Sequence, residues 1–407
     1  MNKLLITLIC LWIASSYASA LSPEDSTVMQ LKKEIIKDLK GNILPFWVKR
    51  SPDIMDGFWG ALNFDGTPKM DAPRGGILNT RLVWTFSSAY RLLKDTLYLK
   101  LANRAQRYFI NRFIDTEYGG SYYIVGVNGA PLDAKKDTYQ NAFAIYGLSE
   151  HYRATGNWES LVAAITIYQK LVENAYDSIN GGFIESFTRD WKMIDIKSPK
   201  TMNTNLHVLE ALTNLYRIWK DKGLKEQLRR QIDVMTHKAL NQTTWHEQLF
   251  LTMDWQNQQN IDSYGHDIEF SWLLVEAAEV LGDEEILEDA KRIAVNLAVV
   301  QLEQGIDKDG AMMYEKAGDH LNADREWWPQ TEAVTGFLNA WKISGDKKFL
   351  DAAVRAWNWI KNNMIDHEYG EWYSNVYPDG KPQKDRVKAD QWRCPYHNSR
   401  MGFELLR

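Results

Sequence analysis

The segment 262–269 places a histidine and a glutamate three positions apart, His266 and Glu269, just before an apolar run that predicts the start of a helix. Residues with this spacing lie on one helical face, so the pattern predicts an imidazole beside a carboxylate. Such a neighbour selects which ring nitrogen carries the proton, and a histidine held in this way exchanges protons near neutral pH. A solvated surface pair would have the same sequence, and the remainder of the chain decides between the two.

Polar and aromatic residues recur at the starts of five other expected helices, where a plain core would carry leucine or alanine. These positions hold Asn79, Arg81, Tyr139, Asn203, His207, Trp327, Trp328, Trp392 and His397. A buried charge or imidazole is costly unless it is paired. Repeated placement therefore favours a wet, functional cavity over an ordinary core.

Each of these residues also has a purely structural explanation. His207 lies in a strongly apolar helix, where a lone histidine is usually a satisfied core residue. Arg81 is similar, although an inward guanidinium needs an anionic or oxygen-rich partner. Trp327 and Trp328 could simply pack in the core. Because Trp392 occupies the equivalent position of another unit, the tryptophans favour a wall on which a sugar stacks.

The balance of side chains narrows the chemistry. Three histidines and Glu269 could assemble a metal site, but neither His-Glu-x-x-His nor His-x-His occurs, so we predict no metal. A glycosidase requires two opposed carboxylates about 5–10 Å apart. Glu269 is the only clear carboxylate at these positions, with Asp195, Glu332 and Asp390 as candidate partners. Imidazoles outnumber carboxylates, which favours proton transfer at a carbon next to a carbonyl over acetal hydrolysis.

The composition indicates a globular chain with an excess of aromatic surface. Its 407 residues are 45% hydrophobic and 25% charged, ordinary values for a protein with a real core. The 17 tryptophans are unusual, and together with 19 tyrosines they suit the apolar faces of sugars. A net charge of −5 leaves no basic footprint, so we predict no nucleic-acid partner.

Residues 1–20 have the pattern of a secretory signal peptide. Lys3 supplies the positive end, residues 4–13 the apolar run, and Ala18-Ser-Ala20 the small-residue cleavage site. We therefore predict an exported protein, periplasmic or extracellular, whose mature part is a single domain over 21–407. No later stretch is long and apolar enough to cross a bilayer, so no membrane association is expected. Cys394 is the only cysteine after the signal, which allows no disulfide within the chain.

The mature chain contains six similar units, each with a turn, a short β-like segment, a second turn and a helix. Counted between Gly57, Gly119, Gly181, Glu247, Gly310 and Gly370, the steps are 62, 62, 66, 63 and 60 residues. One set of helices, with wide apolar faces, is expected near 77–94, 138–155, 202–220, 266–281, 328–344 and 396–405. A more amphipathic set is expected near 96–114, 158–175, 224–240, 283–303 and 347–364.

An N-terminal helix near 24–40 has no partner in this scheme, and neither does the final helix. Pairing the two closes a ring of twelve helices, an all-α (α/α)6 barrel of six inner and six outer helices. The alternative is an open helical solenoid, which the complementary end helices disfavour. Because every hairpin precedes an inner helix, we expect short β-hairpins to line one rim, around a pit that collects the polar positions described above.

Five segments together resemble the cellobiose 2-epimerases of the N-acylglucosamine 2-epimerase superfamily, in order and in approximate spacing. They are RGGILNTRLVWTFSSAY at 74–90, TMNTNLHVLEA at 201–211, GHDIEFSWLL at 265–274, REWWPQ at 325–330 and WRCPYH at 392–397. The resemblance spans essentially the whole mature chain. It implies the same barrel and a cofactor-independent inversion at C2 of the reducing-end sugar of a β-1,4-linked disaccharide such as cellobiose, mannobiose or lactose.

The resemblance also implies a role for each site residue. His397 would remove and return the C2 proton, and His266, supported by Glu269, would open the ring and move protons at its oxygens. His207 and Arg81 would stabilise the cis-enediolate. The remaining predicted residues would bind the sugar: Tyr139, Asn203, Trp327, Trp328, Trp392 and Asp195.

Other activities stay open at this point. They are epimerisation or aldose–ketose isomerisation of a monosaccharide or N-acylglucosamine, and glycoside hydrolysis on the same fold. A sugar-binding protein without activity is disfavoured by the three histidines. We expect no cofactor and a monomeric chain, and the export signal departs from the cytoplasmic setting usual for this family.

Overall fold

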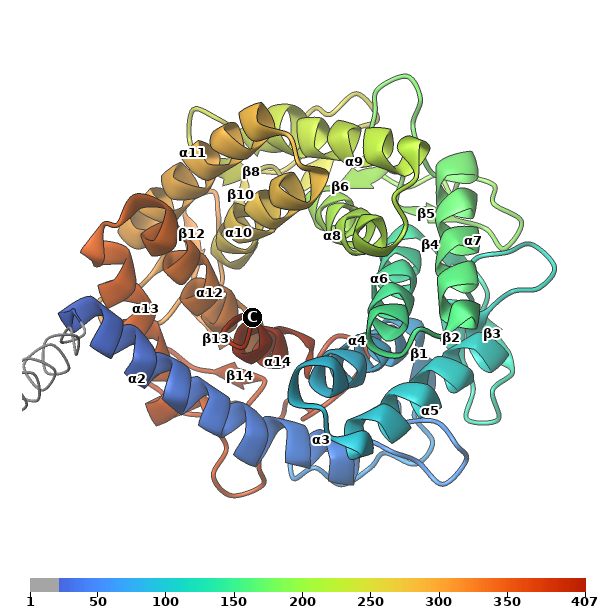
Figure 1. The fold of residues 1–407 in the computed structure, drawn as a ribbon, viewed down its shortest axis with the longest axis horizontal. Coiled ribbons are helices and arrows are strands. Elements are labelled where there is room, and N and C mark those ends of the chain that lie inside the picture. The colour runs from blue at the N-terminus through green and yellow to red at the C-terminus, as the bar shows by residue number, and fades with distance from the viewer. Residues whose placement is uncertain (1–21) are drawn as a thin grey trace, which may run out of the picture.

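The computed structural model describes residues 22–407, so the expected signal peptide lies outside the described residues. Its helices form two concentric rings (Figure 1). The inner ring is α4 (Gly76–Leu93), α6 (Thr138–Thr155), α8 (Met202–Ile218), α10 (Tyr264–Leu281), α12 (Trp327–Ser344) and α14 (Tyr396–Glu404). The outer ring is α2 (Pro23–Asp38) with α3 (Leu44–Arg50), α5 (Thr96–Phe113), α7 (Trp158–Asn174), α9 (Lys222–Val234), α11 (Glu284–Val300) and α13 (Lys347–Trp359). The predicted (α/α)6 barrel is therefore confirmed.

The rings close on themselves, which excludes the open solenoid. Each inner helix contacts the next, and α14 contacts α4. In the outer ring, α2 packs against α13 and also touches α14, as the pairing of the two end helices predicted. Short π-helical segments join or extend the outer helices: η1 (Leu39–Ile43), η2 (Met235–Ala239), η3 (Gln301–Gly305) and η4 (Ile360–Met364).

The inner helices pack with their backbones in close contact. A Cβ atom added at Gly147 on α6 would lie 2.5 Å from the backbone oxygen of Thr80 on α4. Only glycine allows this approach, so the backbones of α4 and α6 pack directly against each other at this point.

Local signals set where inner helices end and outer helices begin. The C-caps of α6, α10 and α12 are glycines in the left-handed conformation, Gly156, Gly282 and Gly345, which lack the steric penalty of a Cβ atom. The next residue in each case is the N-cap of an outer helix, whose side chain accepts a backbone N–H: Asn157, Asp283 and Asp346. These three inner helices therefore reverse into their outer partners within two residues.

At the opposite end of the helix pairs, short strands build a continuous rim. The strands are β1 (Arg74–Gly75), β2 (Ile124–Val125), β3 (Pro131–Asp133), β4 (Lys136–Asp137), β5 (Ser186–Phe187), β6 (Lys200–Thr201), β7 (Leu240–Asn241), β8 (His246–Glu247), β9 (Phe250–Leu251), β10 (Ile261–Ser263), β11 (Glu315–Ala317), β12 (His320–Asn322), β13 (Arg325–Glu326) and β14 (Asn375–Val376). All pairings are antiparallel, and β1–β2, β4–β5, β6–β9, β10–β11 and β13–β14 each join one unit to the next. A bridge between Leu62 and Ala389 joins the last unit to the first.

Buried ion pairs hold this rim in most units. A Lys or Arg two residues before an inner helix pairs with the aspartate that opens the turn of the same unit. The pairs are Arg74–Asp53, Lys136–Asp115, Lys200–Asp177 and Arg325–Asp307, at 3.1, 2.7, 2.7 and 2.8 Å. In the sixth unit, Lys388 pairs with Asp366 from further along its loop. The unit before α10 lacks such a pair within the described residues.

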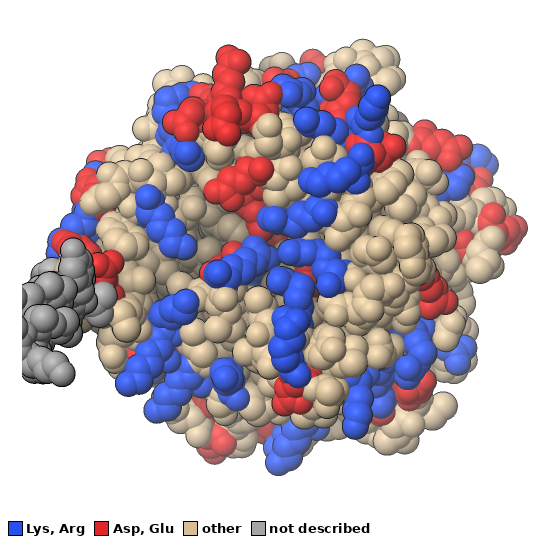
Figure 2. Space-filling model, in the orientation of Figure 1, with Lys and Arg blue, Asp and Glu red and all other residues tan. Residues whose placement is uncertain are grey.

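The end of the barrel opposite the hairpin rim carries both positive and negative side chains. Around the centre of the ring, where the chain ends, Lys and Arg side chains lie among Asp and Glu (Figure 2). Arg407 and Arg217 both donate to Glu276, and Arg407 also pairs with Glu404. In residues 22–407 no helix is both long and apolar enough to cross a bilayer.

Candidate active site

A cavity of about 500 Å³ opens among the first turns of the inner helices, inside the rim. Ten predicted residues line it: Arg81, Tyr139, Asn203, His207, His266, Glu269, Trp327, Trp328, Trp392 and His397. The loops before α12 and α14 complete the wall with Tyr314, Glu326, Ser374, Asn375, Asp385, Arg386, Val387, Asp390 and Arg393. Asp195, also predicted to bind substrate, is exposed and does not line the cavity.

Repeat symmetry sets the floor of the cavity. The sixth residue of α4, α8, α10 and α12 is Arg81, His207, Glu269 and Glu332, respectively, and in α6 it is Phe143. Equivalent positions on equivalent helices face the axis at one depth, so these side chains meet although they come from distant parts of the sequence.

Arg400 of α14 fills the centre of this layer. Its Nη1 donates to Glu210 at 2.6 Å and its Nη2 donates to Glu332 at 2.9 Å. It also donates to Glu269 and to the Tyr396 hydroxyl. The guanidinium is 1% exposed, and a charge this deep persists only when it is paired and hydrogen-bonded.

The carboxyls around Arg400 differ in protonation. Burial raises the pKa of Glu210, but the charge of Arg400 and the hydrogen bonds with His207 and Tyr396 together outweigh burial and bring that pKa to about 2. Burial and repulsion from Glu332 raise the pKa of Glu269 to about 8. Glu269 therefore holds its proton at pH 7, and its Oε2 atom is buried without a partner.

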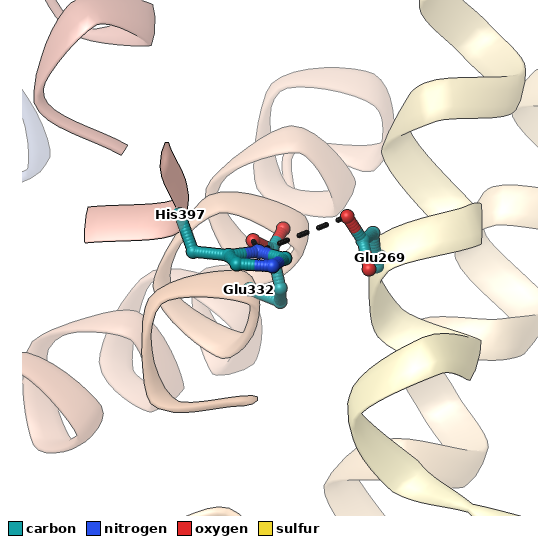
Figure 3. Close-up of side chains that lie close together, drawn as sticks. All are labelled: Glu269, Glu332 and His397. Carbon is teal, nitrogen blue, oxygen red and sulfur yellow. Dashed lines mark hydrogen bonds and ion pairs between the residues drawn. The ribbon is translucent and has the colours of Figure 1, made fainter. Parts of the chain in front are cut away.

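Glu332 orients His397 (Figure 3). His397 Nδ1 lies 2.8 Å from Glu332 Oε1 and 3.9 Å from Glu269 Oε1. A carboxylate at Nδ1 accepts a proton from that nitrogen, which leaves Nε2 as the basic position. Burial and the charge of Arg400 hold the pKa of His397 well below its usual range, so the ring is neutral at pH 7.

His207 is held in the same way from the neighbouring wall. Its Nδ1 lies 3.0 Å from Oε2 of Glu210, three residues further along α8. The other oxygen of Glu210 accepts from Arg400 at 2.6 Å and from the Tyr396 hydroxyl. Burial lowers the pKa of His207, so this imidazole is also neutral. One carboxylate thus joins two sides of the barrel.

His266 corrects the prediction that opened the sequence analysis. Its Nδ1 bonds the hydroxyl of Ser263 at 2.7 Å, while Glu269, three residues on, contacts Arg400 and His397. The shared face was predicted correctly, but the guanidinium on the axis attracts the carboxyl more strongly than a neutral imidazole does. Burial lowers the pKa of His266 to about 3.

Arg81 is the one cation of the cavity floor that has no salt bridge within residues 22–407. Its Nη2 donates to the Tyr139 hydroxyl at 2.6 Å, and its Nη1 donates to the carbonyl of Trp392 at 3.1 Å. The guanidinium carbon lies 4.3 Å from the centre of the Phe143 ring. Its charge is thus held by neutral oxygens and ring faces, and is available to an anionic oxygen in the cavity.

Tryptophans flank the histidines. The ring of Trp328 lies 4.6 Å from that of His266 and 5.6 Å from that of His397, measured between centres. Trp327 lies 6.3 Å from His397 on another side. Trp392 is 48% exposed, so it stands at the mouth. The aromatic wall runs from the reacting floor to the solvent.

Glu269, Glu332 and His397 form a cluster of potential metal ligands, with atoms within 4.8 Å of one another (Figure 3). Arg400 donates to both carboxyls, so this cluster already contains a cation. The same bonds tie the two carboxyls together beneath one wall, whereas a glycosidase needs them on opposite sides of a sugar.

Sequence reasoning missed Arg400, Glu210 and Tyr396, and weighed Glu332 only as a second acid. A signal was present, because His207 and Glu210 have the same three-residue spacing that drew attention to His266 and Glu269. Only the pair of His207 and Glu210 forms, although Arg400 donates to both Glu210 and Glu269, and no local pattern distinguishes the two pairs.

The fold and the site define a class, an acid–base enzyme that acts in the pit of an (α/α)6 barrel. A family model for N-acylglucosamine 2-epimerase matches residues 57–399, and the chain belongs to this family.

Known relatives agree over almost their full length. A cellobiose 2-epimerase of Bacteroides fragilis is 43% identical, covering 92% of this chain and 98% of the relative. One from Ruminococcus albus is 38% identical, with 92% and 97% covered. The solved structure of cellobiose 2-epimerase from Bacillus thermoamylovorans B4167 superposes with a TM-score of 0.90 at 37% identity, covering 93% of this chain and 99% of that one.

Replacing Arg400 by methionine should destabilise the fold. The variant Arg400→Met leaves Glu210, Glu269 and Glu332 without their shared cation, and we expect a loss of about 3–5 kcal/mol in the free energy of unfolding, measured by denaturant titration. The matched control is Arg230→Met, whose surface pair with Glu226 should contribute at most about 1 kcal/mol. Equal losses in the two variants would contradict the central role of Arg400.

Proposed function

We propose that this enzyme inverts C2 of the reducing-end sugar of a β-1,4-linked disaccharide without a cofactor, as the names of its cellobiose 2-epimerase relatives suggest. The observation that carries the proposal is the floor of the cavity. Three neutral histidines meet there beside Arg81, a cation without a carboxylate partner. This set can remove a proton from carbon and hold the resulting negative charge.

His397 acts as the base at C2. Once the sugar ring is open, Nε2 takes the C2 proton, the C–H electron pair forms the C1–C2 double bond, and the carbonyl electrons move to O1. Glu332 bonds Nδ1 at 2.8 Å and stabilises the imidazolium that forms. Inversion then requires the intermediate to present its other face, by rotation about C2–C3 or to a second base, and the return of a proton to that face of C2 completes the reaction.

Arg81 and His207 stabilise the enediolate. A charged guanidinium supported by the Tyr139 hydroxyl donates to O1 and O2, and its burial strengthens that interaction. His207, with Nδ1 held by Glu210, has an unprotonated Nε2 that can take the proton of the O2 hydroxyl and then donate it back to that oxygen. No group has to reorganise as the charge develops.

His266 and Glu269 serve ring opening. Ser263 holds His266 by Nδ1, which leaves Nε2 to exchange a proton with the ring oxygens. Glu269 carries a proton at pH 7 because its pKa is about 8, so its free Oε2 can donate to a sugar hydroxyl. Glu269 thus contacts the substrate directly, instead of supporting His266 as the sequence had predicted.

The cavity also has unsatisfied groups of the kind that a sugar satisfies. Asn203 Oδ1 and Trp327 Nε1 are buried without a partner, and a polyol supplies both donors and acceptors. Trp328 stacks on the reacting sugar. Trp392, half-exposed at the mouth, receives the second sugar of a disaccharide. Asp195 remains a prediction for that outer end. A glycosidase is less well supported, because Arg400 ties the two nearest carboxyls together.

Replacing either histidine should abolish turnover. We expect His397→Asn and His266→Asn each to lower kcat by at least about 100-fold, because general acid–base steps contribute that much or more. The measurement is proton and carbon NMR of cellobiose and of β-1,4-mannobiose in D2O, in which the wild-type product should carry deuterium at C2.

The matched control is His237→Asn, an exposed histidine on η2 that should leave the rate unchanged. Circular dichroism must show each variant folded. Full activity of either cavity variant would remove the role assigned to that residue, and release of monosaccharide by the wild type would favour a glycosidase.

The pH profile should be flat across the ordinary histidine range. Because burial lowers the pKa of His397 and His207 below 6.5, kcat/KM should stay level as the pH falls through 6.5 and decline only below it. On the alkaline side it should fall near pH 8, where the pKa of Glu269 lies. The variant Glu269→Gln, which cannot ionise, should lose the alkaline decline and keep the acid one. An alkaline limb unchanged in this variant would contradict the protonated role of Glu269.

We further propose that residues 1–20 direct export and that the mature enzyme, from Leu21, is a monomer in the periplasm or outside the cell. The basic, apolar and small-residue regions of the segment support this. Fractionation of expressing cells, with mass spectrometry of the product, should find a chain that begins near Leu21 in the exported fraction. Full-length protein confined to the cytoplasm would overturn the proposal.

A further inference from the structure

We propose that a second cleft, on the same rim but outside the pit, binds a saccharide independently of the reaction. It has a volume of about 470 Å³ and lies between the β7–β8 hairpin, the loop before β10 and the end of α11. The evidence comes from comparing this unit with the others. Several residues of its turn differ from those at the equivalent positions elsewhere, and these residues line the cleft.

The unit before α10 has lost the buried ion pair of its neighbours. Asn241 occupies the place of the turn aspartate, shown by its Oδ1 accepting the N–H of Thr243, as Asp115 accepts that of Glu117. Asp262 stands two residues before α10, where four of the other units carry Lys or Arg. The long cationic side chain that fills this space elsewhere is therefore absent here.

An aromatic ring has replaced a glycine in the same turn. In three other units, a glycine donates its N–H to the carbonyl of the turn aspartate; these glycines are Gly119, Gly181 and Gly370. Here Trp245 donates to the carbonyl of Asn241 in the same way. Trp245 has a φ of 58°, in the left-handed region that disfavours a bulky residue. Trp191 and Trp255 share this conformation, but Trp245 is the one of the three whose half-buried ring lines the cleft.

Glu247 places a buried carboxyl at a position where three other units have Ser121, Phe183 and Met312. The N–H of Glu247 bonds Asp267 on the inner helix, as those of Ser121, Phe183 and Met312 bond their own inner helices. Glu247 is 1% exposed, and neither of its carboxyl oxygens has a partner. A buried polar group in this state is costly unless a ligand or its surroundings compensate it.

The lining identifies the chemical class of the ligand. It includes Asn241, Trp245, Glu247, Asn257, Asp262 and Gln304, and none of its residues in the described chain is Lys or Arg. A phosphate or carboxylate ligand would require such cations. Amides, carboxyls and hydroxyls around one flat ring suit a neutral polyol with an apolar face, which is a sugar.

The cleft and the pit share the first turn of α10. Asp267 lies buried behind the cleft, where it bonds two lining residues, His246 at 2.7 Å and the N–H of Glu247, while the preceding residue, His266, lines the pit. Both openings lie on one rim, so the cleft can hold a longer or neighbouring chain while a disaccharide reacts.

The test is calorimetric binding of cellotetraose and mannotetraose to full-length mature enzyme with His397→Asn, which prevents turnover. Two variants restore what the other units carry: Trp245→Gly, and the double variant Asn241→Asp with Asp262→Lys, which rebuilds the ion pair. Both variants introduce residues that other units of this chain carry at the equivalent positions, so we expect both proteins to fold. We expect two sites per chain in the parent, and in each variant a loss of one site or about a tenfold weaker affinity.

In the active background, both variants should retain kcat/KM for the disaccharide within about twofold, which separates the cleft from the pit. The matched control is Trp158→Ala, which removes a 68% exposed tryptophan from α7 and should leave both sites intact. One site in the parent, or unchanged binding in both variants, would overturn the proposal whether or not the enzyme epimerises. Two sites in the His397→Asn protein, together with no epimerisation by the wild-type enzyme, would support the cleft and refute the proposed reaction instead.

Discussion

The burial of Arg400 on the barrel axis is the constraint on which the site depends. One guanidinium bonds carboxyls from three inner helices, α8, α10 and α12, and it comes from a fourth, α14. Two of those carboxyls also bond the reactive imidazoles, His207 and His397. The cation therefore fixes the orientation of both histidines indirectly, through these carboxyls. Its charge also lowers the pKa of His397, so that this ring stays unprotonated and can act as a base.

Charge balance explains why Glu269 is protonated. Glu210, Glu269 and Glu332 all share the cation Arg400, and burial together with repulsion from Glu332 raises the pKa of Glu269 to about 8. In a buried site the free energy is lower when the carboxyl with the weakest compensation keeps its proton, and that carboxyl is Glu269. The arrangement contains neutral bases, a neutral acid and one cation left for an oxyanion, which suits proton transfer at carbon.

The repeat lets a barrel carry such a site without losing its framework. The glycine C-caps, the N-capping residues and the rim ion pairs recur from unit to unit and hold the helices in register. Functional residues occupy positions that the framework leaves free, such as the sixth residue of α4, α8, α10 and α12. The unit before α10 departs from the framework as well, where Asn241, Trp245 and Asp262 replace the structural aspartate, glycine and cation, and there a second cleft opens.

The sequence by itself determined the two rings of helices, the hairpin rim and ten of the residues in the pit, because helical periodicity and turn chemistry are local and the repeat multiplies their signal. It could not determine which side chains pair. Glu269 was expected to hold His266 on grounds of spacing, yet it bonds Arg400, which is 131 residues away. Such contacts depend on closure of the ring, which brings α14 against α12 and α4 and places one buried charge where several distant carboxyls must compete for it.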